Sequence, residues 1–312
     1  MSSQTTEFLS VSEHEAGMRL DKLLSTYFPA YSRTYFQYLI EQGSVLVNGC
    51  RLKKREKPKP GDEIEVCFLL TPELSIEPEN IPLDILYEDE HLLAINKPAG
   101  MVVHPGAGNV SGTFVNALLF YCKNLERDAE NLRPGIVHRL DKGTSGVLLA
   151  AKTAQAHEQL VSLFCQRKIK KRYLAVCLGN PGDGLITAAI GRHPIKRKEM
   201  TVCNEGGKEA ISQCKVLEHN EKFSLVEVDL ITGRTHQIRV HLKYKNTPVL
   251  GDPVYGCASM NQKYGLERQM LHAYQITFIH PITHKPIEIT APLPGDIKKF
   301  INQINFLGKN HR

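Results

Sequence analysis

The sequence HRLDKGTSGVLLAAKT, residues 138–153, joins a charged turn to an apolar run. Asp141 lies between Arg139 and Lys142, and small turn-forming residues follow it up to Gly146. The run GVLLAAKT is typical of a buried strand, so the aspartate is expected in a loop just before a strand. Nearby positive charge favours the ionised form of a carboxylate, which would leave Asp141 available as a nucleophile or an electrostatic stabiliser. A structural salt bridge explains the same residues, and both interpretations stay open at this point.

Strands outnumber helices in the sequence around this turn. Strands are predicted for KKRYLAVCLG (170–179), AISQCKVLEH (210–219) and KFSLVEVDLITG (222–233), and a hairpin for residues 272–292. Helical periodicity marks TFVNALLFYC (113–122), residues 153–169 and RTHQIRVHLKYKN (234–246). Because the strands and helices do not alternate strictly, we predict an α+β domain built on a mostly antiparallel mixed sheet flanked by helices.

A smaller module precedes this domain. Two helical stretches, MRLDKLLSTYF (18–28) and SRTYFQYLIEQG (32–43), come before two short predicted strands at 44–50 and 62–68. The loop between the strands, RLKKREKPKPG (51–61), is strongly basic, and its cations are Arg51, Lys53, Lys54, Arg55, Lys57 and Lys59. Such a loop is either a solvated surface or a contact for phosphates.

Composition and motif absences narrow the class of protein. The 312 residues suffice for two domains, and the net charge of +6 favours an anionic partner. No signal peptide and no apolar run of membrane-spanning length are visible, and the eight cysteines are scattered without a C-x-x-C pair, so a cytoplasmic protein without a membrane partner is expected.

Cofactor motifs are also lacking. The glycine-rich stretch VVHPGAGNVSG (102–112) lacks the third glycine of the dinucleotide fingerprint, and no P-loop or metal-ligand spacing occurs. His236 and His241 lie five residues apart, a poor spacing for metal ligands, and are expected to be hydrogen-bonded or to face nucleic acid. No second carboxylate stands out beside Asp141, which argues against ordinary glycoside hydrolysis. We therefore expect no cofactor and no metal.

Several longer motifs carry a specific resemblance. NKPAGMVVHPG (96–106), RPGIVHRLDKGTSGVLLAAKT (133–153), KKRYLAVCLG (170–179), GRTHQIRVHLKYKNTPVLGDPVYG (233–256) and RQMLHAYQITFIHP (268–281) together resemble the RluA family of pseudouridine synthases. The segments RLDKLL, SR, LIEQGSVLVNG and KPGDEIEV resemble an S4-type RNA-binding domain, as in the RluD-like subgroup. The two residues after the aspartate differ from the usual pattern of this family. Lys142 stands where Arg is common, and Gly143 stands where an acidic residue is common.

The resemblance implies an enzyme that isomerises uridine in RNA to pseudouridine after base flipping, without cofactor or metal. It assigns the catalytic carboxylate to Asp141, its ion-pair partner to Arg239, and uracil stacking, with a further role as a base, to Tyr173. Arg139 would extrude the target nucleotide, which costs roughly a few kcal/mol. The residues expected to contact RNA are Arg33, Arg51, Lys53, Lys54, Arg55, Lys171 and Arg172.

The expected organisation is an N-terminal extension (1–16), an S4-like domain (17–77), a catalytic domain (78–306) and a C-terminal tail (307–312). The expected partner is 23S ribosomal RNA or the large ribosomal subunit, with target uridines near helix 69, and a monomer is favoured. Three alternatives remain: an RNA-binding ribosome-assembly factor that needs no catalysis, a nucleosidase-like hydrolase that would release free uracil, or a family member acting on other rRNA or tRNA uridines. The sequence leaves open whether Asp141 attacks C1′ or removes the C2′ proton.

Overall fold

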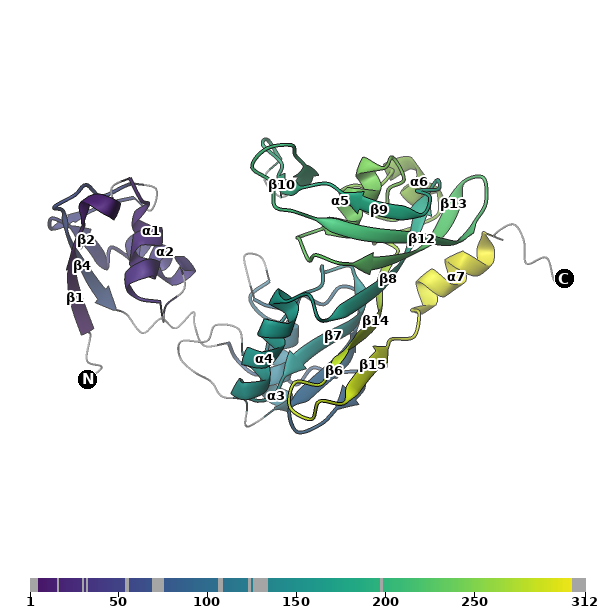
Figure 1. Ribbon diagram of the computed structural model, residues 1–312, viewed down its shortest axis with the longest axis horizontal. Coiled ribbons are helices and arrows are strands. Elements are labelled where there is room, and N and C mark those ends of the chain that lie inside the picture. The colour runs from purple at the N-terminus through teal and green to yellow at the C-terminus, as the bar shows by residue number, and fades with distance from the viewer. Residues whose placement is uncertain are drawn as a thin grey trace. The chain divides into compact units, whose positions relative to one another are not determined.

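The chain consists of two compact units, and the boundary along the sequence lies between Ile76 and Glu77. The computed structural model describes residues 5–15, 17–29, 31, 33–53, 56–68, 76–105, 109–122, 125, 134–196 and 199–304. Figure 1 shows the elements of both units. We call residues up to Ile76 the N-terminal unit and the residues from Glu77 to Arg127 and from Arg133 onward the C-terminal unit.

The N-terminal unit packs two helices against a small antiparallel sheet. The helices α1 (Leu20–Tyr27) and α2 (Arg33–Gln42) confirm the two predicted helical stretches. The sheet has the order β1-β4-β2-β3, and its strands are β1 (Thr5–Ser10), β2 (Val45–Val47), β3 (Cys50–Arg51) and β4 (Glu63–Phe68). Leucines of α1, Phe36 of α2 and the inward residues of β2 and β4 form one apolar core.

The N-terminus differs from the prediction. Residues 1–16 were expected to be an extension outside the module, but β1 pairs along its whole length with β4, from Thr5 opposite Phe68 to Ser10 opposite Glu63. β1 is an edge strand whose side chains from residue 6 to residue 10 are mostly exposed. Its mostly polar sequence, TTEFLS, therefore carries little of the apolar alternation that predicts a strand.

A buried carboxylate joins the two helices of this unit. Asp21 of α1 is fully buried and accepts hydrogen bonds from Arg19, Arg33 and Gln37, with Arg33 Nε at 2.9 Å. Burial alone would raise the pKa of Asp21, but the hydrogen bonds from Arg33, Gln37 and Arg19 outweigh it and hold this pKa below its usual value. The charge on Asp21 therefore fixes α1 against α2.

The C-terminal unit is built on one mixed sheet, which in the described residues has nine strands. Eight follow one another across the sheet: β5 (Ile85–Glu88), β6 (Leu92–Lys97), β7 (Ser145–Ala151), β14 (Leu271–Ile279), β8 (Lys170–Leu178), β13 (Phe223–Leu230), β12 (Ile211–His219) and β9 (Gly184–Thr187). The ninth, β15 (Pro286–Thr290), pairs with β14. Only β7 and β14 pair in parallel among these strands, so the predicted α+β class with a mostly antiparallel sheet is confirmed.

Helices cover different parts of this sheet. The helices of the unit are α3 (Phe114–Tyr121), α4 (Ala154–Cys165), α5 (Gln237–Tyr244), α6 (Ala258–Lys263) and α7 (Gly295–Gln303). Ala156 and Leu160 of α4 pack on the β6-β7-β14 part, whereas Ile297 and Phe300 of α7 pack on the β8-β13 part (Figure 1). A separate hairpin, β10 (Ile190–Arg192) with β11 (Met200–Val202), packs on the side of α5. In the described residues no helix could span a membrane.

Gly146 makes the parallel contact possible. It has a φ of +111°, and a Cβ at this position would lie 2.2 Å from the carbonyl oxygen of Ala273 in β14. No side chain fits there, because the backbones of β7 and β14 meet at this point. The glycine that ends HRLDKGTSG therefore sets where the loop of Asp141 enters the sheet.

Replacing Asp21 by Asn should destabilise the N-terminal unit at pH 7 by about 1–3 kcal/mol, since hydrogen bonds to a buried charge are lost. Because the folded-state pKa of Asp21 is lowered, its stabilisation is present above the unfolded pKa and is lost as pH falls through the folded pKa. When the pH is lowered below about 5, the free energy of unfolding should therefore fall less for Asp21→Asn than for the wild type. Hydrogen exchange of the α1 and α2 amides measures both effects, with Glu63→Gln as the exposed control; equal opening free energies in wild type and Asp21→Asn would contradict this role.

Candidate active site

Asp141 lies at the edge of a cleft of about 540 Å³ in the C-terminal unit. The cleft is formed by the loop of residues 137–141, the C-terminal end of α4, the start of β8, the end of β13 and the start of α5. The Asp141 side chain is about one-fifth exposed, so its carboxylate can reach a molecule in the cleft.

The turn that follows β6 holds the loop that carries Asp141. The backbone N–H of Gly100 donates to the carbonyl of Lys142 at 2.7 Å, and the fully buried Lys97 amine donates to the carbonyls of Pro98, Met101 and Lys142. Burial lowers the pKa of Lys97 to about 7, against the opposing attraction of the Asp141 charge. The turn NKPAG therefore supports the aspartate loop through hydrogen bonds to the Lys142 carbonyl.

His138, at the beginning of the same loop, is also fixed. Its Nε2 accepts the backbone N–H of Leu149 in β7 at 2.8 Å, and its ring stacks on Phe164 of α4 with a centroid distance of 4.9 Å. Burial lowers the pKa of His138 to about 3, so the imidazole is neutral and can accept this bond. The loop is therefore anchored on both sides of the aspartate.

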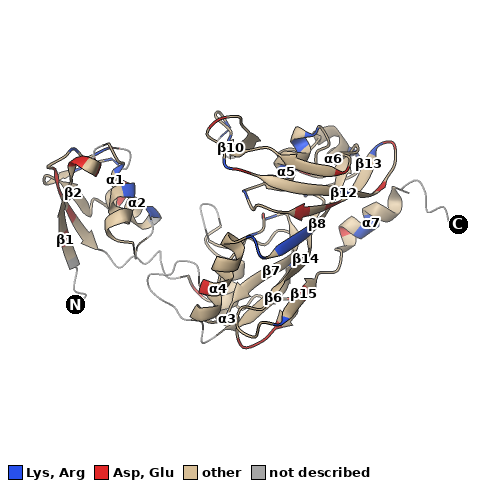
Figure 2. Ribbon diagram, viewed as in Figure 1, with Lys and Arg blue, Asp and Glu red and all other residues tan. Residues whose placement is uncertain are grey.

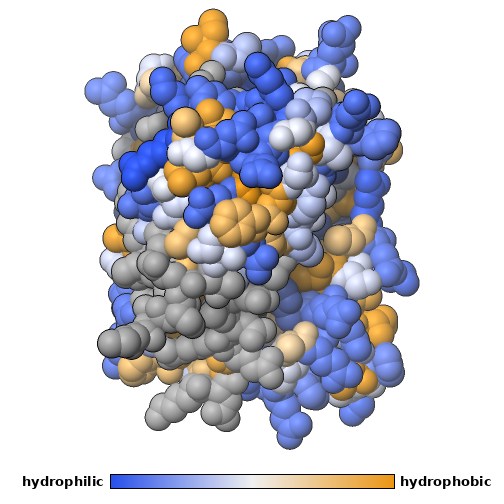
Figure 3. Space-filling view, turned by 90° about the vertical axis from the view of Figure 1, so that its left-hand side faces the viewer, coloured by the Kyte–Doolittle hydropathy of each residue, from blue (hydrophilic) through white to orange (hydrophobic). Residues whose placement is uncertain are grey.

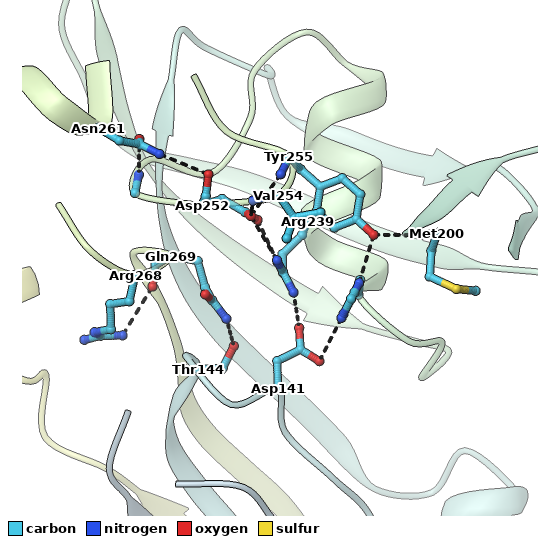
Figure 4. A network of polar contacts seen from close by, with 12 residues as sticks. Asp141, Thr144, Met200, Arg239, Asp252, Val254, Tyr255, Asn261, Arg268 and Gln269 are labelled. Carbon is cyan, nitrogen blue, oxygen red and sulfur yellow. Dashed lines mark hydrogen bonds and ion pairs between the residues drawn. The ribbon is translucent and has the colours of Figure 1, made fainter. Parts of the chain in front are cut away.

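Arg239 of α5 grips Asp141 from the other side of the cleft. Its Nη1 donates to Asp141 Oδ2 at 2.9 Å, while its Nε and Nη2 donate to the two oxygens of Asp252 at 2.6 and 2.9 Å (Figure 4). Burial alone would lower the pKa of Arg239, but the hydrogen bonds and charges of Asp252 and Asp141 raise it above its usual value. The predicted pair of Asp141 and Arg239 thus meets in space, although 97 residues separate the two in sequence.

Asp252 is the second carboxylate that the sequence did not single out. It is buried, and its Oδ1 also accepts the backbone N–H groups of Val254 and Tyr255 at 2.8 and 3.0 Å (Figure 4). Its oxygens are taken up by the guanidinium and the following turn, so Asp252 orients Arg239 rather than reaching the cleft. The GDPVYG motif places it, but only the fold shows its partner.

Tyr173 of β8 lines the same cleft and is 7% exposed. Burial, and next the Asp141 charge, raise the pKa of its phenol well above the usual value. The neutral phenol is therefore the stable form in the free protein. The predicted stacking on uracil stays a prediction, and a role as an ionised base is disfavoured before the substrate binds.

The basic residues at the start of β8, blue in Figure 2, point to opposite faces of the strand. Lys171 and Tyr173 line the cleft, since side chains two apart share one face of a strand. Arg172 lies on the opposite face, where it pairs with Glu227 and Asp229 and donates to Gln275. The structure therefore brings Lys171 to Asp141 but does not bring Arg172 there. Arg139 is exposed and also lines the cleft.

The predicted RNA contacts of the N-terminal unit have different surroundings. Arg33 is 45% exposed but bound to Asp21, and the Arg51 guanidinium packs over Gly43 at the end of α2. Lys53 is exposed, and Lys54 and Arg55 lie outside the described residues. In the upper half of the face drawn in Figure 3, hydrophilic side chains surround a hydrophobic area. These RNA contacts stay predictions.

The buried amine of Lys97 predicts an unusual pH dependence of stability. Its folded pKa of about 7 lies below that of an unfolded lysine, so the unfolded chain binds more protons above neutral pH and stability rises with pH there. Lys97→Met should remove this rise, which is at most about 1.4 kcal/mol per pH unit. Urea unfolding at pH 7 and pH 9 measures the rise in the free energy of unfolding, with Lys152→Met as the control. An equal rise in wild type and Lys97→Met would contradict the lowered pKa of Lys97.

Comparison with known proteins identifies the family of the chain. The family described as RNA pseudouridylate synthase matches residues 91–244, and the S4 domain family matches residues 18–64. The RNA pseudouridine synthase YlyB of Bacillus subtilis, itself named uncharacterized, is 42% identical over 95% of this chain and 97% of its own length. The ribosomal large subunit pseudouridine synthase D of Xanthomonas campestris is 40% identical over 97% of this chain and 96% of its own length.

Solved structures agree as well. Human RNA pseudouridylate synthase domain containing 4 has a TM-score of 0.56 at 27% identity, covering 71% of this chain and 92% of that one. Human RNA pseudouridylate synthase domain containing 1 has a TM-score of 0.55, also at 27% identity, covering 70% of this chain and 84% of that one. From the full-length identity and the matched domains, the chain belongs to the RluA-family RNA pseudouridine synthases, in the RluD-like group with an N-terminal S4 domain.

Proposed function

We propose that this pseudouridine synthase isomerises specific uridines of 23S ribosomal RNA, in the region of helix 69, and that Asp141 is its catalytic carboxylate. One observation carries the catalytic part: Asp141 is the carboxylate at the cleft, and Arg239 holds it at 2.9 Å. The name of the relatives, ribosomal large subunit pseudouridine synthase D, supports the ribosomal target. Such a target places the enzyme in the cytoplasm.

The reaction breaks the N1–C1′ bond of uridine and forms a C5–C1′ bond, and the C5 proton leaves while N1 regains one. Asp141 starts it as a carboxylate, either by attacking C1′ or by removing the C2′ proton. Both routes require an ionised group at the sugar, and both are served by the cation of Arg239, which stabilises the charge and fixes the direction of the free oxygen. Binding and orientation by the chain's own residues are sufficient for this isomerisation.

Access to the sugar requires that the uridine leaves its stack. Arg139, two residues before Asp141 and exposed at the cleft, is suited to fill the gap, because a guanidinium stacks on bases and bonds to phosphate. Tyr173 then supports the uracil ring inside the cleft. Lys171, whose amine lies over the Phe164 ring at 5.8 Å, supplies positive charge for a phosphate beside the site.

The N-terminal unit adds RNA affinity through exposed cations of its basic loop, such as Lys53. The competing function is an RNA-binding assembly factor for which catalysis is not needed. It is disfavoured because a pure binding protein has no use for a buried arginine fork that presents one aspartate to a cleft. A second alternative, the same chemistry on other rRNA or tRNA uridines, differs only in the RNA bound.

Asp141→Ala should abolish turnover while RNA binding stays within about twofold, since Asp141 contributes charge to the chemical step and not a phosphate contact. The measurement is tritium release from large-subunit rRNA carrying 5-tritiated uridine, which reports loss of the C5 hydrogen only when the base is reattached through carbon. Asp141→Asn tests the same with the shape kept, and Asp84→Asn, an exposed carboxylate outside the cleft, is the control.

Substantial tritium release by Asp141→Ala would overturn the assigned mechanism. Release by wild type from tRNA but not from rRNA would move the substrate and leave the mechanism intact. No release by wild type from either RNA would favour the assembly factor, with Asp141 a structural ion-pair partner.

A further inference from the structure

A chain of polar contacts runs from the β10–β11 hairpin to Asp141. The backbone N–H of Met200, the first residue of β11, donates to the hydroxyl of Tyr255 at 2.8 Å (Figure 4). The same hydroxyl lies 2.8 Å from Nδ1 of His236, and Nε2 of that ring lies 3.9 Å from Asp141 Oδ1. Arg239 holds the other oxygen, Oδ2, so the two sides of the carboxylate have different partners.

The contacts indicate which ring nitrogen carries the proton. Because the Tyr255 oxygen accepts the Met200 N–H, its own proton is best used in a bond to Nδ1 of His236. A neutral imidazole then carries its hydrogen on Nε2, the atom that faces Asp141. The distance of 3.9 Å is too long for a hydrogen bond, so this N–H is aimed at the carboxylate but not bonded to it in the free protein.

The backbone holds His236 in a costly conformation. Its φ of 56° is left-handed, and it is the N-cap residue of α5 without a side-chain capping bond. The next residue, Gln237, is buried and bonds to Thr232, Ser212 and the carbonyl of Ile211, so the turn is locked. Strain of this kind in a non-glycine residue persists where the surroundings enforce it, and it often marks functional positions.

The hairpin is a firm base for Tyr255. The Tyr255 ring is buried with Ile190 of β10 and Val240 of α5, and Met200 packs on the same cluster. The ring also lies under the Arg239 guanidinium at 5.0 Å and meets His236 edge to face. A displacement of the hairpin would therefore be transmitted to both residues that surround the Asp141 carboxylate.

Burial favours the neutral form of His236. Burial lowers its pKa below the usual value, Arg239 and Arg139 add to this effect, and Asp141 and Asp252 oppose it. The ionisable groups that face it are Asp141, Arg139, Arg239, Asp252 and Tyr255. A neutral donor can orient the free oxygen of Asp141 without competing with Arg239 for the charge.

We propose that His236 and Tyr255 are positioning residues, and that RNA bound in the cleft closes the His236 Nε2–H onto Asp141 Oδ1. The contact orients the reacting oxygen and ties the catalytic carboxylate to the hairpin. It rests on the proposed role of Asp141. The part of this contact that orients the reacting oxygen in the transition state acts on the chemical step, and the part gained on binding acts on the RNA Kd.

The test is single-turnover tritium release together with RNA binding for Tyr255→Phe, His236→Asn and the double variant. Tyr255→Phe keeps the ring over Arg239 and removes only the hydroxyl, and asparagine tolerates the left-handed backbone of residue 236. Each single variant should react roughly three- to tenfold more slowly, with a smaller change in RNA Kd. The double variant should be no slower than His236→Asn alone, because Tyr255 acts through His236.

Tyr121→Phe is the matched control. It removes a hydroxyl that donates to Glu88 at 2.7 Å, and Tyr121 does not line the cleft. A wild-type rate for Tyr255→Phe, or effects of the two variants that multiply, would overturn the proposal. These outcomes are separate from failure of the catalytic assignment, which appears as turnover in Asp141→Ala. An inactive Asp141→Ala with an unaffected Tyr255→Phe would leave Asp141 in its role and remove His236 and Tyr255 from theirs.

Discussion

The active site depends on one buried arginine that serves two carboxylates. Arg239 binds Asp252 through two hydrogen bonds and Asp141 through a third. Asp252 offsets the cost of burying the guanidinium, so the remaining N–H can be directed at Asp141 in a partly dry cleft. A single aspartate facing a single cation would be free to turn. Because Asp252 holds the guanidinium, one oxygen of Asp141 is fixed, and the other is the oxygen that would react in the proposed mechanism.

The mixed sheet explains why these residues meet. The parallel step between β7 and β14 requires the close backbone approach at Gly146, and it places the Asp141 loop beside the antiparallel half of the sheet that carries β8. The alternation along β8 then turns Tyr173 and Lys171 into the cleft and Arg172 away from it. Lys97 supports the loop from β6, and α5 delivers Arg239 from the far side. The cleft and the proposed catalytic residues therefore come from both halves of one sheet.

Local sequence patterns predicted the elements that carry the site, whereas the pairing of Asp141 with Arg239 and the roles of Tyr173 and Arg139 came from the resemblance to the family. The charged turn before an apolar run predicted a loop entering a strand, and the helical periodicity at 234–246 predicted the helix that carries Arg239. Other features depend on pairing between distant segments. The buried role of Asp252, the hold of Lys97 on the loop and the side of the sheet that Arg172 faces follow from register and packing, which no local pattern encodes. The strand at Thr5–Ser10 was missed for the same reason, since its only strong signal is its partner β4.

The claim that Arg239 fixes Asp141 for reaction is tested most directly by the single-turnover rate of Arg239→Lys. Lysine keeps the positive charge but cannot bind two carboxylates in a planar fork. The account predicts a loss of about 100-fold or more in rate with RNA Kd unchanged, an effect of the size found when one preorganised charge partner is removed. Arg19→Lys, which alters a similar fork on Asp21 in the N-terminal unit, should react like wild type. A rate for Arg239→Lys within about twofold of wild type would contradict the account.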